Sequence, residues 1–429
     1  MNQPLVSVIM TVYNAEKYVA ESIKSVLNQT YDKLQFIIIN DGSNDRSPEI
    51  ICDFSDARIE YYSLAENHHI AYATNIGFSK AKGYYIAIMD SDDLWQPDKL
   101  EKQVKYLQSH PEHEGCFTWV DLIDEDNHSL NEQMAELRDL YAASTESQEY
   151  WLRFFFFYGN RLNNPSSLIT YAAFQKIGYH NLFYQQAPDM EWWVRFAQNF
   201  TFGIIEEPLI KYRRGTYSDL NNSAYSDIKD TRFYNEHMYI RYHLLENLED
   251  DLFIRTFKPW FHCTDSCTPE ELICEKAFLL CLPINNSTAY SALGLLKLEE
   301  LLADQHMADL LQNRYQLSTI KCGEYTGTHL FNDLILQKYP SKIKDLEKWL
   351  NLTQLHIQKL EDNIEKQYIQ KSAEVTALKN TLQLQNQEIQ HLTTQLDSML
   401  HSKSWKLTTP LRFIGSIIHK SVSPKNNQE

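Results

Sequence analysis

The sequence has few basic residues, few glycines and prolines, and no long uninterrupted apolar run. Its 429 residues include 12 glycines and 13 prolines and are 43% hydrophobic, which excludes a collagenous or low-complexity chain and predicts two or three folded domains. Lysine and arginine number 40 against 57 aspartates and glutamates, a net charge of −17. Because few cations are available to neutralise phosphates, general nucleic-acid binding is not expected.

Signals for export, membrane insertion and zinc binding are also scarce. No cationic stretch precedes the first apolar segment, so we expect no secretory signal. The longest uncharged stretch, residues 277–296, is interrupted by Pro283 and by polar residues at 285–288, and it predicts two core helices joined by a turn. The seven cysteines include no CxxC pair, which favours buried thiols over a zinc site.

The first 110 residues alternate between two hydrophobic patterns. Apolar, β-branched runs predict strands at 5–13, 36–39, 59–62 and 84–89, and helical spacing predicts helices at 15–27, 47–54 and 70–82. This alternation is typical of βαβ units, so the expected fold class is α/β with a mostly parallel sheet. In such sheets ligands bind outside the carboxyl ends of the strands.

Helices dominate the rest of the predicted structure. One more strand is expected at 114–123, an aromatic helix at 149–158, a loop, strand and short helix within 160–178, a helix at 189–199 and helices throughout 215–339. Residues 343–399 repeat apolar or tolerated positions in steps of three and four, with one stutter at 364–368 and no glycine or proline. This seam favours a coiled coil over a folded-back helical hairpin, and a coiled coil predicts a homo-oligomer.

Polar residues gather where the predicted strands end. Thr11 and Tyr13 lie at the end of the first strand, and Asp41 lies in an Asn-Asp-Gly-Ser sequence that a simple turn would also explain. Asp90, Asp92 and Asp93 follow another strand; a helix cap, suggested by the proline at position 97, accounts for one of these carboxylates and not for three. Crowded carboxylates repel one another unless a cation lies between them, and hard oxygen ligands suit Mg²⁺ or Mn²⁺.

Taken together, these motifs resemble the family 2 glycosyltransferases, which are inverting enzymes of the GT-A fold. The resemblance also includes Asn-Gln-Thr-Tyr at 28–31, Gly83 before the strand that ends at Asp90, and Pro-Asp-Met-Glu-Trp-Trp-Val-Arg at 188–195. It covers residues 4–215, about half of the chain.

The resemblance implies a role for each matching residue. Thr11 and Tyr13 would line the nucleobase pocket, with Tyr13 stacking on the base, and Asp41 would accept a hydrogen bond from the base. Asp92 would lie near the ribose and the metal, and Asp93 would bind the Mn²⁺ or Mg²⁺ that bridges the two phosphates. Asp189 would be the general base, and Asp90 would support the end of its strand. Of Trp192 and Trp193, one side chain would pack in the core and the other would face the acceptor.

Three positions depart from the family pattern. Asn40 replaces the first of two paired carboxylates, Pro188 replaces a glutamate before the base, and Thr74 replaces an arginine near the phosphates. Five cations could substitute for that arginine, although an ordinary surface role is the simpler interpretation of each: His68, His69, Lys80, Arg213 and Arg214.

The resemblance implies transfer of a sugar from a nucleotide-diphosphate donor, with UDP favoured, to a hydroxyl of a lipid-linked glycan, as in synthesis of a bacterial capsule or other surface polysaccharide. The expected divisions are 1–110 for the donor half, 111–215 for the acceptor half, 216–339 for a helical domain, 340–400 for the coiled coil and 401–429 for a basic tail. An alternative is a catalytically weak scaffold that organises other enzymes through the coiled coil. The replacement of a glutamate by Pro188 before the base leaves this alternative open. A nucleotidyltransferase would need a Gly-rich, basic loop after the first strand, and this sequence has none there.

The basic tail has its own predicted partner. Residues 401–429 carry five basic residues and one acidic residue, whereas residues 1–400 carry 35 and 56. Residues 404–412 resemble the Trp-Lys-Leu-Thr-x-Pro-Leu-Arg ending of many bacterial polysaccharide glycosyltransferases. Residues 401–420 are therefore expected to bind an anionic membrane, which would make the enzyme cytoplasmic and peripheral on the inner face of the cell membrane and near polyisoprenyl-linked acceptors. The alternative is a tail helix that packs on the protein's own body.

Overall fold

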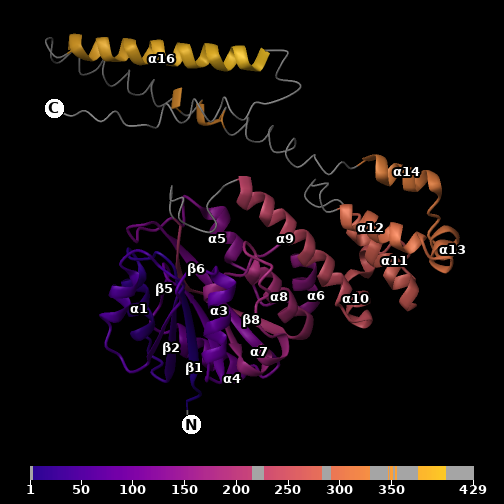
Figure 1. Cartoon of the computed structure of the whole chain (residues 1–429), viewed down its shortest axis with the longest axis horizontal. Coiled ribbons are helices and arrows are strands. Elements are labelled where there is room, and N and C mark those ends of the chain that lie inside the picture. Colours follow the sequence, from indigo (N-terminus) through magenta and orange to yellow (C-terminus); the bar gives the residue numbers. More distant parts are fainter. Residues whose placement is uncertain are drawn as a thin grey trace. The chain divides into compact units, whose positions relative to one another are not determined.

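The computed structural model describes residues 3–214, 227–282, 291–328, 346, 348–350, 353–354 and 375–401. It divides into two compact units, Met1–Leu334 and Ile335–Glu429 (Figure 1). The first unit contains the sheet and all of the predicted site residues. Its first strands and helices are β1 (Val6–Val12), α1 (Val19–Leu27), β2 (Leu34–Asn40), α2 (Ser47–Cys52), β3 (Ile59–Ser63), α3 (Ile70–Lys80) and β4 (Tyr85–Asp90).

An eight-stranded mixed sheet forms the centre of this unit, with the order β3-β2-β1-β4-β7-β6-β8-β5. The pairs β3·β2, β2·β1, β1·β4 and β6·β8 are parallel, and the pairs that involve β7 or β5 are antiparallel. The predicted α/β fold class with a mostly parallel sheet is thus confirmed. The later elements of this part are β5 (Leu94–Trp95), α4 (Lys99–Ser109), β6 (His113–Ile123), α5 (Ala135–Tyr141), α6 (Gln148–Phe157), η1 (Asn164–Ser166), β7 (Leu168–Thr170), α7 (Tyr171–Ile177), α8 (Pro188–Asn199) and β8 (Thr201–Arg213).

The central strands are buried on both faces. Alternate residues of β1 belong to different hydrophobic clusters: Val8 and Met10 pack with residues of α1 and α4, and Ile9 packs with residues of α3, α6 and α8. Strands that are covered on both sides need apolar residues at every position, which explains why β1, β2 and β4 were recognisable as continuous runs.

Strand β8 is irregular, and the sequence pattern did not predict it. Its register against β6 shifts where Thr118 pairs with Ile205 and Trp119 pairs with Pro208, so Glu206 and Glu207 fall in a bulge and are exposed. At Ile204 the Oγ1 of Thr145 accepts a hydrogen bond from the backbone N–H at 2.8 Å and donates one to the carbonyl at 3.4 Å. A charged, proline-containing stretch interrupts the alternation that identifies strands.

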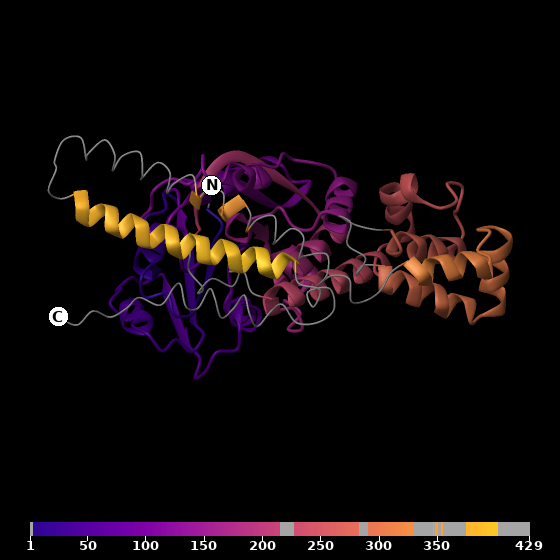
Figure 2. The same ribbon diagram turned by 90° about the horizontal axis from the view of Figure 1, so that it is seen from above.

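A group of helices follows the sheet, as the sequence predicted, and its first members pack on α6 and α8. The elements are α9 (Asp227–Glu246), α10 (Asp250–Phe257), η2 (Lys258–Trp260), α11 (Pro269–Leu280), α12 (Ser291–Leu302), α13 (Gln305–Asn313) and α14 (Thr319–Thr328). Leu272, Leu279 and Leu280 of α11 belong to the same cluster as α6, α8 and α9, and Figure 2 shows this group at one side of the α/β part. The predicted helix pair around Pro283 corresponds to α11 and α12. Among the described residues no helix is both long and apolar enough to cross a membrane.

In the second unit α16 (Val375–His401) is a continuous helix of 27 residues. It covers the last part of the predicted coiled-coil seam, while residues 355–374 and the tail 402–429 lie outside the described residues. Helix pairing and the membrane-binding tail therefore stay predictions.

Candidate active site

The carboxyl ends of β1, β2 and β4 bring the first group of predicted residues together. In the sheet register Thr11 of β1 lies beside Asp90 of β4, and Val12 lies beside Asn40 of β2. Tyr13 follows directly and its side chain is 48% exposed, so its ring is available to a ligand at this edge.

Two loops at this edge are fastened to each other. The N–H of Asn14 donates to the Ser43 hydroxyl at 3.0 Å, and the N–H of Asn44 donates to the Asn14 side-chain oxygen at 2.9 Å. Asn40 accepts from the N–H of Ser43 at 3.1 Å and donates to the Ser63 hydroxyl at 2.9 Å, so the amide in place of the family's carboxylate shapes the turn.

Asp41 and Gly42 fix the outer part of this turn. Asp41 is buried, and its Oδ1 accepts a hydrogen bond from the His68 N–H at 2.9 Å; burial raises the pKa of Asp41, and this bond partly offsets the rise. Gly42 has a φ of 67°, and a Cβ at this position would lie 2.4 Å from the Glu66 carbonyl carbon. Only glycine fits both requirements.

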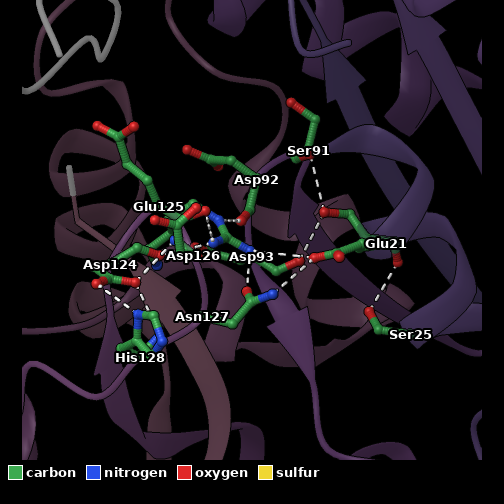
Figure 3. A network of polar contacts seen from close by, with 12 residues as sticks. Glu21, Ser25, Ser91, Asp92, Asp93, Asp124, Glu125, Asp126, Asn127 and His128 are labelled. Atoms are coloured by element: carbon green, nitrogen blue, oxygen red, sulfur yellow. Dashed lines mark hydrogen bonds and ion pairs between the residues drawn. The ribbon is translucent and has the colours of Figure 1, made fainter. Parts of the chain in front are cut away.

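The acidic turn after β4 contains two accessible carboxylates and one inaccessible one. Asp90 and Asp92 are partly exposed, whereas Asp93 is 0% exposed. Burial raises the pKa of all three, that of Asp90 to about 8, and the charges of Asp92 and Asp189 add to the rise at Asp90. In Figure 3 the carboxylate of Asp92 points away from Asp93.

The Asp93 carboxylate is only half satisfied within the described structure. Its Oδ1 accepts a hydrogen bond from the Arg213 N–H at 2.8 Å, and its buried Oδ2 has no hydrogen-bond partner among the described residues. The described residues contain no ready-made group of three or more His, Cys, Asp or Glu side chains that could hold a metal. Two partly exposed carboxylates beside an unsatisfied buried one nevertheless fit a divalent ion whose remaining ligands come from substrate oxygens.

Arg213 joins the acidic turn to the loop that follows β6. This side chain is 2% exposed; Nε donates to the Asp92 carbonyl at 2.7 Å, Nη1 to the Asp124 carbonyl at 2.8 Å and Nη2 to the Asn127 side chain at 2.7 Å. The loop 124–128 is drawn in Figure 3 beside Asp92 and Asp93. Arg213 is therefore a structural residue and does not supply the cation that is missing at Thr74.

The other candidate cations differ in position. Lys80 lies in the last turn of α3, and its ammonium is 5.2 Å from the centre of the Tyr62 ring, so it does not serve the site. Arg214 follows β8, lies 5.1 Å from the centre of the Tyr212 ring, and its charge lowers the pKa of Asp92. Of the five candidates, Arg213 and Arg214 both lower the pKa of Asp92, but only Arg213 is a buried structural residue of the turn.

Asp189 lies in the first turn of α8, close to the strand ends. Its Oδ2 accepts a hydrogen bond from the Asn160 amide at 3.1 Å, and burial raises its pKa. Its charge is near enough to Asp90 to raise the pKa of that group too. The fold thus brings Asp189 and Asp90, 99 positions apart in the sequence, to the same site.

The expected division of the two tryptophans is wrong. Trp192 and Trp193 are both 0% exposed, and the Trp192 indole donates to the Gly178 carbonyl at 2.8 Å. Both therefore belong to the core and neither faces an acceptor.

Tyr141 and Tyr212 are site residues that the sequence did not reveal. Their rings are 5.7 Å apart at 90°, and the pKa of each is raised, mainly by burial, with a contribution from the charge of Asp93. Asp189 contributes at Tyr141 and Asp90 at Tyr212. Tyr212 lies near the end of β8, so the missed strand concealed it; Tyr141 belongs to a short helix without a recognisable pattern.

The Gly42 turn yields a stability prediction with a built-in control. Gly42 and Gly178 both have a positive φ, but a Cβ on Gly178 would meet nothing within 4 Å. Gly178 lies at φ 75° and ψ −164°, so Gly178→Ala should cost only the backbone strain of roughly 1–3 kcal/mol. Gly42→Ala should cost about 1–3 kcal/mol more because the methyl group displaces the loop at Glu66. Equal losses of unfolding free energy in urea titrations of the two variants would contradict this account of the turn.

Comparison with known proteins gives the family. The model of glycosyl transferase family 2 matches residues 7–175. An uncharacterized glycosyltransferase of Methanocaldococcus jannaschii is 36% identical over 218 residues, which cover 50% of this chain and 72% of the relative. A putative teichuronic acid biosynthesis glycosyltransferase of Bacillus subtilis is 37% identical over 134 residues, which cover 30% of this chain and 52% of the relative.

A further curated relative and one solved structure are also similar. An uncharacterized glycosyltransferase of Haemophilus influenzae is 31% identical over 218 residues, which cover 49% of this chain and 66% of the relative. The structure of S. aureus TarS 1–349 in complex with UDP-GlcNAc superposes with a TM-score of 0.47 at 16% identity, covering 75% of this chain and 92% of that one. The family match and the extent and identity of the M. jannaschii alignment show that the chain belongs to glycosyltransferase family 2.

Proposed function

We propose that this protein is an inverting glycosyltransferase that moves a sugar from a nucleotide-diphosphate donor, a UDP-sugar, to a hydroxyl of a lipid-linked glycan. The observation that carries the proposal is the meeting of Asp189 with the acidic turn. Asp189, in the first turn of α8, lies near enough to the turn after β4 for its charge to raise the pKa of Asp90, at the carboxyl edge of the sheet. Substrates of α/β sheets bind at that edge.

The donor base is proposed to bind between the first two loops. The exposed Tyr13 ring would stack on the base, Thr11 would line the pocket beneath it, and Asp41 would accept a hydrogen bond from a base N–H. The His68 N–H holds one oxygen of Asp41 at 2.9 Å, which fixes the carboxylate before the donor arrives.

The phosphates and a divalent ion, Mn²⁺ or Mg²⁺, are proposed to bind at the acidic turn. Asp92 and Asp90 are accessible, so we assign them the ion. The resemblance implied Asp93 together with Asp92, but Asp93 is buried and held by Arg213. When bound, the ion would offset the negative charge of the nucleotide diphosphate. Asp93 would keep the turn in place and contribute at most its unsatisfied Oδ2.

Asp189 is proposed as the general base. Burial raises its pKa, which makes its carboxylate a stronger proton acceptor than an exposed aspartate. It would take the proton from the acceptor hydroxyl while that oxygen bonds to the anomeric carbon and the bond to the nucleotide diphosphate breaks. A single displacement inverts the anomeric configuration without a covalent sugar–enzyme intermediate.

Pro188, which kept the scaffold alternative open, does not argue against catalysis. It occupies the first position of α8, where proline's missing N–H and fixed φ suit a helix. Asp189 still lies in the first helical turn, so the lost glutamate does not displace the proposed base.

The biological setting is proposed from the relatives and the tail. The B. subtilis relative is named for teichuronic acid biosynthesis, which supports a role in bacterial surface polysaccharide synthesis. Residues 401–420 would attach the enzyme to the cytoplasmic face of the membrane, near polyisoprenyl-linked acceptors, and residues 343–399 would form a homo-oligomer.

Replacing the base tests the central proposal. Asp189→Asn should lower sugar transfer by about 10²–10⁴-fold, since general-base catalysis supplies about that factor. Donor affinity, measured by calorimetry, should stay unchanged. Glu191→Gln is the control, because Glu191 lies in the same turn but pairs with Arg195 at 2.7 Å. Near wild-type turnover of Asp189→Asn would sink the proposal.

Replacing single carboxylates of the acidic turn tests the metal assignment. Asp92→Asn should remove most of the rise in melting temperature that UDP and Mn²⁺ together produce, because binding to the folded state stabilises it. Asp93→Asn should keep that rise, since the amide oxygen of the new side chain can still accept from the Arg213 N–H. The opposite pattern would make Asp93 the ligand.

Sedimentation with liposomes tests the tail. The full chain should co-sediment with anionic liposomes, with each basic residue contributing about 1 kcal/mol, and much less in high salt. A chain that ends at Met399 should remain in the supernatant. Equal sedimentation of both would rule out membrane binding by the tail.

A further inference from the structure

The loop before the proposed base is held by a carboxylate from another part of the chain. Glu236 lies in α9 and is 3% exposed. Its Oε1 accepts a hydrogen bond from the Gln185 N–H at 2.8 Å, and its Oε2 accepts from the N–H groups of Gln186 at 2.8 Å and Ala187 at 2.7 Å. Three consecutive backbone donors thus converge on one buried side chain.

This arrangement fixes the segment that leads into α8 and does not cap the helix itself, whose free N–H groups lie in the first turn after Ala187. Ala187 is the N-cap residue of α8 and has no side chain that could cap it, and Pro188 has no N–H. The carboxylate of Glu236 accepts from the N–H groups of all three residues before Pro188, and hydrogen bonds to a charged acceptor are stronger than neutral ones. Asp189 is two residues beyond the last of these donors, so the position of its backbone depends on this carboxylate.

His237, the next residue of α9, packs against the segment that contains Asn160, whose amide donates a hydrogen bond to Asp189. A Cβ on Gly159 would lie 3.1 Å from the His237 ring, and Gly159 precedes Asn160, whose amide donates to Asp189. His237 is buried, and burial lowers its pKa to about 4, so the ring packs there uncharged. Adjacent residues of one helix therefore support both segments that hold the Asp189 side chain.

We propose that Glu236 is a positioning residue of the transferase reaction: it fixes the 185–187 loop so that the Asp189 carboxylate is aimed at the acceptor hydroxyl. This inference rests on the proposed role of Asp189 as the base. It also gives the helical region, which lies outside the family match at 7–175, a part in catalysis. Misplacement of a catalytic group by about 1 Å can lower a rate by about 10²-fold.

The test compares two buried glutamates that each hold a loop. Glu275 of α11 is 0% exposed and accepts hydrogen bonds from the N–H groups of His262 and Cys263 and from the Ser266 hydroxyl, but its loop does not lead to Asp189. Glu236→Gln and Glu275→Gln each replace one acceptor oxygen by a donor. Both should lower the melting temperature by similar amounts, which separates a loss of stability from a loss of positioning.

The two variants should differ in catalysis. Glu236→Gln should lower kcat for transfer by about 10- to 10²-fold, measured well below both melting temperatures, while the donor Kd stays unchanged. Amide hydrogen exchange at 185–187 should accelerate in this variant alone. Glu275→Gln should keep kcat within about twofold of the wild type.

The outcomes separate this inference from the function on which it rests. If the wild type is active and Asp189→Asn is not, but Glu236→Gln keeps its kcat or Glu275→Gln loses as much, Glu236 is only a stabilising residue and the inference is wrong. If Asp189→Asn retains full activity, the base assignment fails and the positioning role fails with it.

Discussion

The guanidinium of Arg213 holds together segments that would otherwise repel one another. The guanidinium donates to the backbone carbonyl of Asp92 in the acidic turn, to the carbonyls of Asp124 and Glu125 and to the side-chain oxygen of Asn127. It also lies 4.4 Å from the centre of the Tyr18 ring and 3.6 Å from the Glu21 carboxylate, just before and within α1. A buried charge is costly unless it is fully paired, and here the pairing fixes the geometry of the acidic turn.

The guanidinium holds the acidic turn through the backbone of Asp92 and not through its carboxylate. Arg213 donates its backbone N–H to Asp93 and its Nε to the carbonyl of Asp92, which leaves the Asp92 carboxylate outside. The division between an accessible carboxylate and a structural one follows from this contact. The sequence alone could not predict which of Asp92 and Asp93 is accessible, since both residues are aspartates.

The sequence predicted the strands that are buried on both faces, and it predicted the residues at the ends of these strands. Thr11, Asp41 and Asp90 could be placed because β1, β2 and β4 are continuous apolar runs, and parallel strands end at the same edge. Strand β8 could not be found, because Glu206, Glu207 and Pro208 interrupt its pattern. Because that strand was not predicted, the position of Tyr212 and the structural role of Arg213 could not be predicted either. The role of Glu236 could not be predicted for another reason. It accepts hydrogen bonds from backbone N–H groups 49 to 51 residues away, and such a contact produces no periodic pattern in the sequence.

The bulge in β8 also affects how copies of the protein meet one another. Much of the outer edge of this long strand lies beyond the two residues that pair with β5, and an unpaired edge is a template for strands of other molecules. Here the Thr145 hydroxyl occupies the hydrogen-bonding groups of Ile204, and Glu206, Glu207 and Pro208 follow with exposed charges and no donor at the proline. At high protein concentration an open strand edge would be exposed to intermolecular strand pairing. This edge opposes such aggregation and leaves association to surfaces elsewhere on the molecule.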